Sequence, residues 1–320
     1  MNSEKKKLYT HQRFVMFALD PIHIGAGGYR LGRVDNSIVR EMGTNLPKIP
    51  GTSIAGAARS YASMRYGKPE AAGQHKRFIG EKEKCPIIYT FGTATETGGG
   101  EAGKVSFGDA RILFFPVPSV AGPVWVTTKE ILEEVGFTVN GGDVGEETVL
   151  SNLSWSKEQI NLGWLSLNHN RGLTISPPEK IKDKKEWKAI ENRIVLISQK
   201  LFSEVVNSNL EVRTSVAINP ETGAAEDGAL FTYEALPRAT WLWHDIIEDD
   251  YKQSFPITEN QFKDNKENSG DALGEIWGRP LDVVKAGLRL IEYLGIGGMG
   301  TRGFGRMKSI CDWEVGSNGS

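Results

Sequence analysis

The chain has 320 residues, of which 39% are hydrophobic and 24% are charged, and its formal net charge is −2. This length suffices for one elaborated domain or two small ones, and the near-neutral charge excludes nucleic-acid binding driven by overall charge, though not a local phosphate-binding groove. No segment approaches the ~20 apolar residues of a membrane span. Two cysteines and five scattered histidines give neither a disulfide framework nor a zinc-finger spacing. We therefore expect a cytoplasmic protein with no membrane partner.

The first part of the chain is predicted to pass from a strand through a glycine-rich turn to a helix. Apolar residues alternate loosely over Arg13–Leu19, which predicts a strand. The turn Gly25–Gly32 and a short extended piece, Ser37–Arg40, follow it. Apolar residues at helical spacing from Ile54 to Met64 predict a helix that ends at Gly67.

Three features of this first part together predict a ligand site. The turn that holds Gly25 and Gly27 lets the main chain approach a ligand closely. Thr52 and Ser53 stand where the predicted helix begins, and the unpaired N–H groups of a first helical turn favour an anion. Asp35 lies between them, and a single carboxylate there suits a metal ion or a proton transfer. Taken one at a time, the three features are also explained by an ordinary loop, an Asp in a turn, and a helix cap.

The middle of the chain is predicted to hold two strands, one helix and one insertion. Val105–Val117 is strongly apolar and predicts a core strand that is broken at Pro116, and Pro123–Thr127 predicts a short strand. Thr127 with Glu130 forms a capping-box pattern that opens a helix. Residues 137–188 show no clear period and are interpreted as an insertion, whose lysine-rich end is expected to be a solvated face more than an RNA contact.

The last part of the chain is predicted to contain a projecting β-hairpin. Strands at Leu210–Ile218 and Leu230–Glu234 flank a turn rich in Asn, Pro and Gly, so residues 210–237 form the hairpin. Such an arm is more plausible as a contact for a partner than as an idle projection. The other elements expected here are a strand at Arg193–Ile197, a helix at Ser198–Asn207 capped by Ser198, a strand at Thr240–Ile247, an amphipathic helix at Leu281–Leu294 and a strand at Met307–Val315. The apolar face of the amphipathic helix is expected to include Val284, Leu288, Ile291 and Leu294.

A second glycine-rich loop lies between the last predicted helix and the last predicted strand. Six glycines fall within residues 295–306, more than a helix cap needs. The loop also holds Gly298, Thr301, Arg302 and Arg306, so it predicts a cradle of backbone amides with two basic side chains for phosphate.

These elements predict an α+β fold with a ferredoxin-like or RRM-like core, long insertions and the hairpin, all within one domain over residues 1–320. The expected strands do not show the continuous Val and Ile runs of a parallel sheet. No helix follows the first glycine turn, and no Walker sequence occurs, so the sequence argues against a nucleotide-dependent enzyme.

The chain resembles the RAMP superfamily of CRISPR-associated proteins, and most of all the repeated backbone subunit of the type III-B effector, the Cmr complex. The likeness lies in four segments, which are His23–Gly27 with Asp35 and Val39–Glu41; Ile49–Ser53 with Gly56 and Arg59; Val105–Val117 with Trp125–Thr127; and Leu210–Pro237. The loop at 295–306 is common to the wider superfamily.

This resemblance implies a subunit that binds guide RNA, copies of itself in a filament, other effector subunits and a complementary target RNA. The hairpin would act as a thumb that splays the target, and the aspartate matching Asp35 would be the catalytic residue and the ligand of a weakly held Mg²⁺ or Mn²⁺. The ribose 2′-hydroxyl would then attack at regularly spaced sites. His23 and Glu234 are the candidate helpers in catalysis. The candidate RNA-binding residues are Gly25, Gly27, Arg40, Thr52, Ser53, Arg59, Gly298, Thr301, Arg302 and Arg306.

Two departures from the family pattern bear on this reading. Asn36-Ser37 replaces a residue-proline pair, which affects the rigidity of that loop, and Ala55 stands where lysine is frequent, which leaves Arg59 more of the phosphate binding. Three alternatives stay open: a guide-binding subunit that does not cleave, a metal-independent guide-processing endonuclease with His23 as general base, and a protein–protein adaptor.

Overall fold

The computed structural model describes residues 8–27, 34–73, 84–93, 100–142, 144–219, 221–223, 225–256 and 277–316, with the side chains of 217 and 225–229 left out. Residues 28–32 of the predicted first glycine turn lie outside the described residues. Within the described ranges, none of the helices has the length and apolar character needed to cross a membrane.

The described chain contains both helices and strands, and most of the elements expected from the sequence are found. The helices are α1 (Gly51–Arg65), α2 (Pro86–Phe91), α3 (Lys129–Val135), α4 (Glu179–Lys182), α5 (Lys185–Ile190), α6 (Gln199–Ser208) and α7 (Pro280–Leu294), with 3₁₀ turns η1 (Pro69–Ala72) and η4 (Gly300–Arg302). The strands are β1 (Thr10–Ala18), β2 (Val105–Phe107), β3 (Arg111–Val117), β4 (Val124–Thr127), β5 (Thr138–Asn140), β6 (Thr148–Ser151), β7 (Gln159–Leu162), β8 (Leu165–Arg171), β9 (Thr174–Ser176), β10 (Ile194–Leu196), β11 (Glu211–Ile218), β12 (Ala225–Ala235), β13 (Trp241–Glu248) and β14 (Met307–Glu314).

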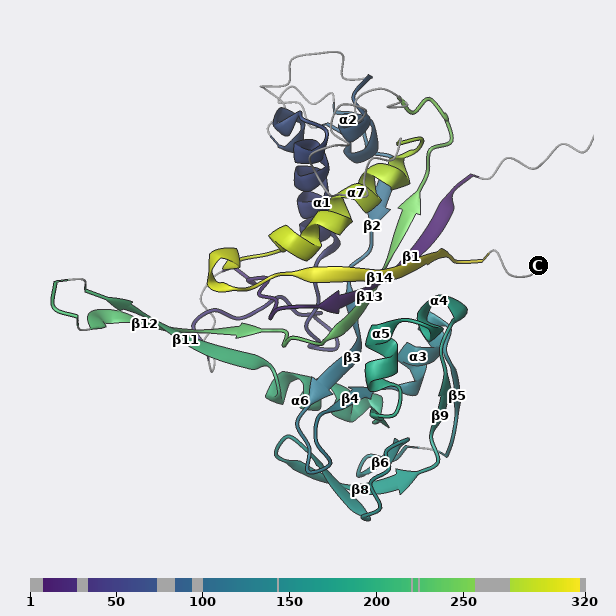
Figure 1. Ribbon diagram of the computed structural model, residues 1–320, viewed down its shortest axis with the longest axis vertical. Coiled ribbons are helices and arrows are strands. Elements are labelled where there is room, and N and C mark those ends of the chain that lie inside the picture. The colour runs from purple at the N-terminus through teal and green to yellow at the C-terminus, as the bar shows by residue number, and fades with distance from the viewer. Residues whose placement is uncertain are drawn as a thin grey trace, which may run out of the picture.

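The upper half of the molecule in Figure 1 is an antiparallel sheet with α1 and α7 packed together on one face. The strand order is β14-β1-β13-β3, and β2 also pairs with β13. One helix, α1, follows β1, and α7 connects β13 to β14. This order and these crossings match a split βαβ unit. The mixed α+β class predicted from the sequence is confirmed.

The lower half continues the same sheet. Strand β3 pairs with β13 through its first residues and with β4 through its last residues, and the order then runs β4-β10-β6-β8-β7. Two neighbouring pairs in this half, β4 with β10 and β6 with β8, are parallel. Residues 137–188 contribute β5 to β9, α4 and α5 here. Their status as an insertion and the one-domain organisation of the whole chain stay predictions.

The core has two main parts, one on each face of the sheet. Alternate residues of β1, including Phe14 and Met16, face the helices and pack in one cluster with Ile54 of α1 and Leu288 of α7. Residues of opposite parity face the second cluster, in which the indole of Trp241 contacts the ring of Phe114 edge to face. The period of two along each strand thus separates the two clusters.

The break in the predicted strand Val105–Val117 lies elsewhere than expected. The chain leaves the sheet at Gly108–Ala110, and Pro116 stays inside β3 opposite Trp125. The cause is Asp109, whose carboxylate accepts a hydrogen bond from Gly51 N (2.8 Å) and forms an ion pair with Lys48 (2.5 Å). Pro116 lacks an N–H, but its partner Trp125 does not need one. The backbone of Trp125 faces away from β3, since Trp125 N donates to the carbonyl of Arg193.

Two further expectations are corrected at the ends of helices. The cap of α3 is Thr128, whose hydroxyl accepts from Ile131 N (3.3 Å), whereas Thr127 is buried at the end of β4. Leu294, predicted to share the apolar face of α7, is 54% exposed because that helix ends there and the chain turns at Gly295.

One buried histidine makes stability depend on pH. His244 in β13 stacks on Phe14, and burial lowers its pKa from 6.5 to about 4, an effect that the Asp245 carboxylate opposes. Between pH 6.5 and about pH 4, the His244 side chain is protonated in the unfolded chain but neutral in the folded chain. The free energy of unfolding therefore falls as the pH falls. We expect this group to lower the free energy of unfolding by about 2 kcal/mol from pH 7 to pH 5.

Urea denaturation at pH 7 and pH 5 checks this expectation in the wild-type chain and in His244→Leu, which has a similar volume. The loss of stability on acidification should be smaller in His244→Leu by about 2 kcal/mol. An equal loss in both proteins would contradict the assignment to His244.

Candidate active site at the base of the hairpin

The hairpin of β11 and β12 projects to the left in Figure 1, and its base is held on both faces. Side chains alternate between the faces of a strand. Phe231 and Tyr233 of β12 therefore face the loop at 299–304, where Tyr233 contacts the ring of Phe304. Thr232 and Glu234 point the other way and bond the segment 35–40. The hairpin base thus joins the two regions in which the sequence predicted ligand contacts.

Asp35 lies directly beside β12 and is fully exposed to solvent. Its Oδ2 accepts hydrogen bonds from Thr232 N (2.7 Å) and Thr232 Oγ1 (2.9 Å). The backbone bond and then the side-chain bond from Thr232 hold the pKa of the Asp35 carboxyl below its ordinary value of 3.8. Asp35 is therefore a carboxylate at neutral pH. Both bonds from Thr232 go to Oδ2, and no side chain in the described part of the chain bonds Oδ1.

Glu234 is paired with Arg40 in a largely buried ion pair. Arg40 Nη2 donates to Glu234 Oε2 (2.8 Å), and the two side chains are 13% and 12% exposed. The same oxygen accepts from Ile38 N (3.3 Å), while Arg40 Nε donates to Asn207 of α6 (2.9 Å). These contacts support a role for both residues in fixing the segment that carries Asp35. Direct roles in catalysis or RNA binding stay predictions.

His23 lies beneath both glycine-rich regions and is 5% exposed. Its Nδ1 is 2.6 Å from the carbonyl oxygen of Glu234, and because a carbonyl only accepts, Nδ1 carries the proton. Gly25 covers the other nitrogen, since a Cβ at Gly25 would lie 3.3 Å from Nε2. Gly298 N donates to the backbone oxygen of His23 (2.9 Å), so the two loops meet at this residue. This placement supports a structural role for His23.

The described part of the first glycine turn folds back on the segment after Asp35. Gly25 forms an antiparallel bridge with Ile38, and Ala26 N donates to Ser37 O (2.9 Å). Gly27 has a φ of 70°, the left-handed region that glycine adopts without strain, and a Cβ there would meet no atom of the described residues within 4 Å. As far as the described residues go, the backbone at Gly27 is therefore open to approach by a ligand.

The loop at 299–304 places its basic side chain against the hairpin. The Arg302 guanidinium lies 5.3 Å from the ring centroid of Phe231 and donates to Ser215 (3.4 Å), and Thr301 is exposed beside it. Arg306 lies at the end of the loop and bonds both carboxylate oxygens of Asp20, at 2.5 and 3.1 Å. Asp20 raises the pKa of Arg306 and offsets its charge.

The predicted anion site at the start of α1 is partly filled by the protein itself. Gly51 N donates to Asp109 and Ser53 N donates to Pro50 O (2.9 Å), which leaves exposed Thr52 at the helix start. Half-buried Arg59 donates to the carbonyl of Ala71 (2.8 Å), and burial lowers its pKa. The structure therefore does not gather all the predicted RNA-binding residues at one point.

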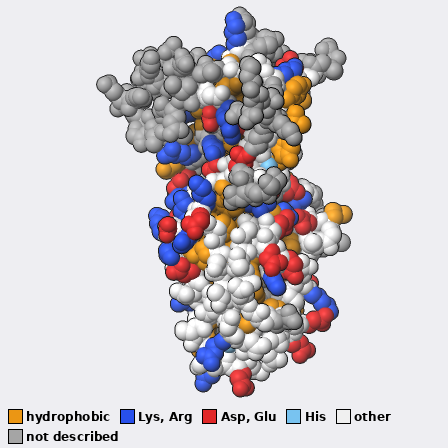
Figure 2. All heavy atoms as spheres, turned by 90° about the vertical axis from the view of Figure 1, so that its right-hand side faces the viewer, with side chains coloured by type: hydrophobic (Ala, Val, Ile, Leu, Met, Phe, Trp, Pro, Cys, Tyr) orange, Lys and Arg blue, Asp and Glu red, His pale blue; other side chains and the backbone are white. Residues whose placement is uncertain are grey.

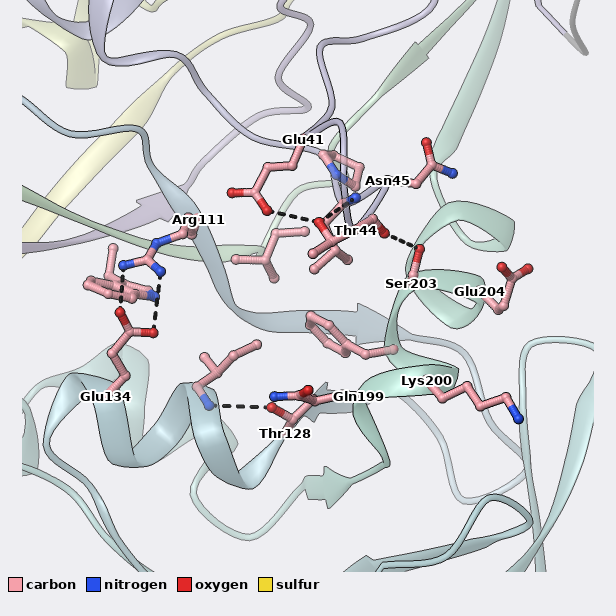
Figure 3. A pocket seen from close by; sticks show the side chains of 16 residues that line it. Glu41, Thr44, Asn45, Arg111, Thr128, Glu134, Gln199, Lys200, Ser203 and Glu204 are labelled. Carbon is pink, nitrogen blue, oxygen red and sulfur yellow. Dashed lines mark hydrogen bonds and ion pairs between the residues drawn. The ribbon is translucent and has the colours of Figure 1, made fainter.

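A cavity of about 550 Å³ is separate from these residues (Figure 3). It lies between the loop after Arg40, strand β3 and helices α3 and α6, and no predicted site residue lines it. Ser203 Oγ donates to Thr44 O (2.8 Å) and Asn207 Nδ2 donates to Asn45 O (3.0 Å). These bonds attach that loop to α6, so the walls of the cavity help to position Arg40.

The site is thus a surface and not an enclosed pocket. Figure 2 shows the face opposite the hairpin, where the Lys and Arg side chains drawn in colour lie among Asp and Glu side chains. The formal net charge of −2 gives the chain no overall attraction for phosphate, so phosphate binding at the site must be local, through exposed backbone and a few cations. No three His, Cys, Asp or Glu side chains come together as a metal-binding group in the described ranges. The exposed carboxylate of Asp35 can offer one oxygen ligand to a hard cation.

Sequence reasoning missed Thr232, which contacts Asp35 most closely. The two residues are 197 positions apart, and a threonine in a strand is so common that no local pattern marks it. Only the pairing of the segment after Asp35 with β12, through the Asn36–Tyr233 bridge, brings them together.

The fold is similar to solved structures of related complexes and subunits. The matches include a type III-B Cmr-beta complex bound to cognate target RNA (TM-score 0.61, 15% identical, 95% of this chain and 99% of that chain). They also include oligomeric Cmr4 from Pyrococcus furiosus (TM-score 0.56, 21% identical, 96% of this chain and 98% of that chain). At these identities the similarity shows the fold.

Sequence comparison extends the similarity over almost the whole chain. The chain is 28% identical to the CRISPR system Cmr endoribonuclease Cmr4 of Pyrococcus furiosus, covering 95% of this chain and 96% of that protein. It is 25% identical to the CRISPR system Cms endoribonuclease Csm3 of Methanothermobacter thermautotrophicus, covering 90% and 78%. The family model described as "RAMP superfamily" matches residues 18–308. The predicted resemblance is confirmed, and this chain belongs to the RAMP superfamily.

Proposed function

We propose that this chain is the guide-RNA-binding backbone subunit of a type III-B CRISPR effector and that it cleaves complementary target RNA. The observation that carries the proposal is an exposed, ionised Asp35 bonded to the base of a projecting hairpin. The 28% identical relative is named an endoribonuclease, which supports RNA cleavage as the activity. The structural relatives include an oligomeric subunit and a complex with target RNA, which supports copies of the chain, other effector subunits and RNA as partners.

The proposed division of labour follows from the placement of the residues. The hairpin separates bases of the guide–target duplex, which releases one target nucleotide from A-form geometry next to Asp35. The Asp35 carboxylate accepts the proton of the ribose 2′-hydroxyl, whose oxygen attacks the adjacent phosphorus as the bond to the 5′-oxygen breaks and that oxygen gains a proton from water. The open backbone at Gly27, the exposed loop at Gly298–Thr301 and the cation of Arg302 contact phosphates.

We further propose that a divalent ion, Mg²⁺ or Mn²⁺, assists this reaction and is held by Asp35. One carboxylate oxygen fits a hard cation whose other ligands come from RNA phosphate and water, so binding without RNA would be weak. When bound, such an ion would stabilise negative charge on the phosphate oxygens. Asp35 is available for it because Thr232 occupies only Oδ2.

The rival guide-processing endonuclease requires His23 as a general base. His23 is 5% exposed and its protonated Nδ1 is bonded to the backbone of β12, which argues against contact with RNA. The rival scaffold that binds guide RNA without cutting differs from our proposal only in activity.

The test uses the assembled effector complex with 5′-labelled complementary RNA, in Mg²⁺, in Mn²⁺ and in EDTA. We expect regularly spaced products with either ion and intact RNA in EDTA. Intact target under all three conditions would favour the non-cleaving scaffold. The same chain without partners should leave free guide-repeat RNA intact in EDTA, and cleavage there would favour the processing enzyme.

A further inference from the structure

We propose that Thr232 is a positioning residue that fixes the Asp35 carboxylate to the hairpin, so that the carboxylate and the hairpin keep a constant position relative to each other. This inference rests on the proposed function, because it assigns Asp35 a part in cleavage. It concerns a residue that does not itself touch the RNA.

The Thr232 hydroxyl is used twice in its contact with Asp35. It accepts a hydrogen bond from Asp35 N (3.1 Å) and donates one to Asp35 Oδ2 (2.9 Å), and Thr232 N donates a third bond to the same oxygen (2.7 Å). Because one side-chain oxygen both donates and accepts here, that oxygen has to belong to a hydroxyl. Serine can replace threonine in this geometry, and valine, which has nearly the same shape, cannot.

The residues after Asp35 extend this contact along β12. Asn36 N donates to Thr232 O (3.0 Å), and Glu234 N donates to Asn36 O (3.0 Å). Arg40 then closes the segment through its ion pair with Glu234. The segment 35–40 therefore moves with the hairpin base as one bonded unit.

Thr232 is needed because little else restrains the Asp35 side chain. The carboxylate has no burial, so packing does not select its rotamer. The two Thr232 donors favour the ionised form of Asp35 and hold the pKa of its carboxyl below the ordinary value. Without the hydroxyl, the carboxylate would keep the amide bond but lose one of the two donors that orient it, and cleavage geometry is sensitive to such displacement.

The activity test compares three variants in the assembled effector complex. In Thr232→Val we expect target cleavage to slow about tenfold, the lower end of the range seen when a group that orients a ligand is removed. Guide-RNA affinity should be unchanged, and Thr232→Ser should restore the wild-type rate. Thr214→Val is the matched control, because Thr214 is the cross-strand partner of Thr232. The same threonine-to-valine change is thus made directly opposite Thr232 in the hairpin. An equal loss in Thr214→Val would overturn the proposal.

A second measurement does not depend on activity. The carboxyl ¹³C resonance of Asp35 is followed by pH titration of the full-length chain without RNA, with Asp35→Asn identifying the signal. We expect the pKa of Asp35 to rise in Thr232→Val, because a donor to the ionised form is lost, and to stay low in Thr232→Ser. An unchanged pKa in Thr232→Val would overturn the contact itself.

The two measurements separate the inference from the proposed function. If Asp35→Asn leaves cleavage undiminished, Asp35 has no part in the reaction and the proposed function fails, whatever the titration shows. If Asp35→Asn abolishes cleavage while Thr232→Val cleaves at the wild-type rate, the proposed function stands and the positioning role of Thr232 is wrong.

Discussion

Replacing Asp35 with asparagine is expected to slow target-RNA cleavage by about 10²- to 10⁴-fold, the range typical for loss of a group that transfers a proton. Asparagine keeps the shape of the side chain but cannot accept the 2′-hydroxyl proton and is a poorer ligand for a divalent ion. Guide-RNA binding should be unchanged, because the exposed carboxylate contributes no packing to the fold. Single-turnover cleavage by the assembled complex and a filter-binding assay with guide RNA measure the two quantities.

Asp183→Asn serves as the matched control for this experiment. Asp183 is an exposed aspartate at the end of α4, in the lower half of the molecule, so the same chemical change there should leave cleavage at the wild-type rate. Undiminished cleavage by Asp35→Asn would refute the assignment of Asp35. A parallel loss of guide binding would show that Asp35 acts in assembly and not in the chemical step.

Replacing Gly287 with alanine is expected to destabilise the fold by about 3 kcal/mol, because α1 and α7 touch at this position. A Cβ at Gly287 would lie 2.1 Å from the backbone oxygen of Ala58, a contact that no rotamer change can relieve. The two helices would have to separate and loosen the packing of Ile54 and Leu288. For a chain of 320 residues we expect the Tm to fall by about 4–5 °C in differential scanning calorimetry.

Gly56→Ala provides the control, since it makes the same exchange on the exposed side of α1. A Cβ at Gly56 would meet nothing within 4 Å, and alanine favours the helix, so the free energy of unfolding should rise by about 0.5–1 kcal/mol. A Tm of Gly287→Ala equal to that of the wild type would mean that α1 and α7 are not in the close contact described here.

Local sequence patterns predicted most of the fold. Helices α1, α6 and α7 and strands β1, β11, β13 and β14 follow from apolar periodicity, helix caps and turn residues, which act over a few positions. The errors arise where a distant residue decides the structure. Asp109 leaves the sheet because it bonds Gly51 at the start of α1. The apolar run from Val105 to Val117 contains no pattern that predicts this distant contact.

The candidate site was predicted in its residue types but not in its arrangement. Glycine loops and a lone carboxylate can be recognised in a sequence because their chemistry is distinctive. The sequence did not reveal that Glu234 bonds Arg40 or that Arg306 bonds Asp20, since ion pairs between distant residues leave no local pattern. Residues 137–188 lack a clear period because their strands and helices are only 3 to 7 residues long.

Strand β3 has a mechanical consequence, since it belongs to both halves of the sheet. Bending the molecule where the two halves join would break main-chain hydrogen bonds between β3 and β13 or between β3 and β4. The hairpin rises from the end of α6 below and returns into β13 above, so its direction is set by the stiffness of the whole body. In a row of copies that all keep this shape, the hairpins would project at equal intervals along any RNA that the row carried.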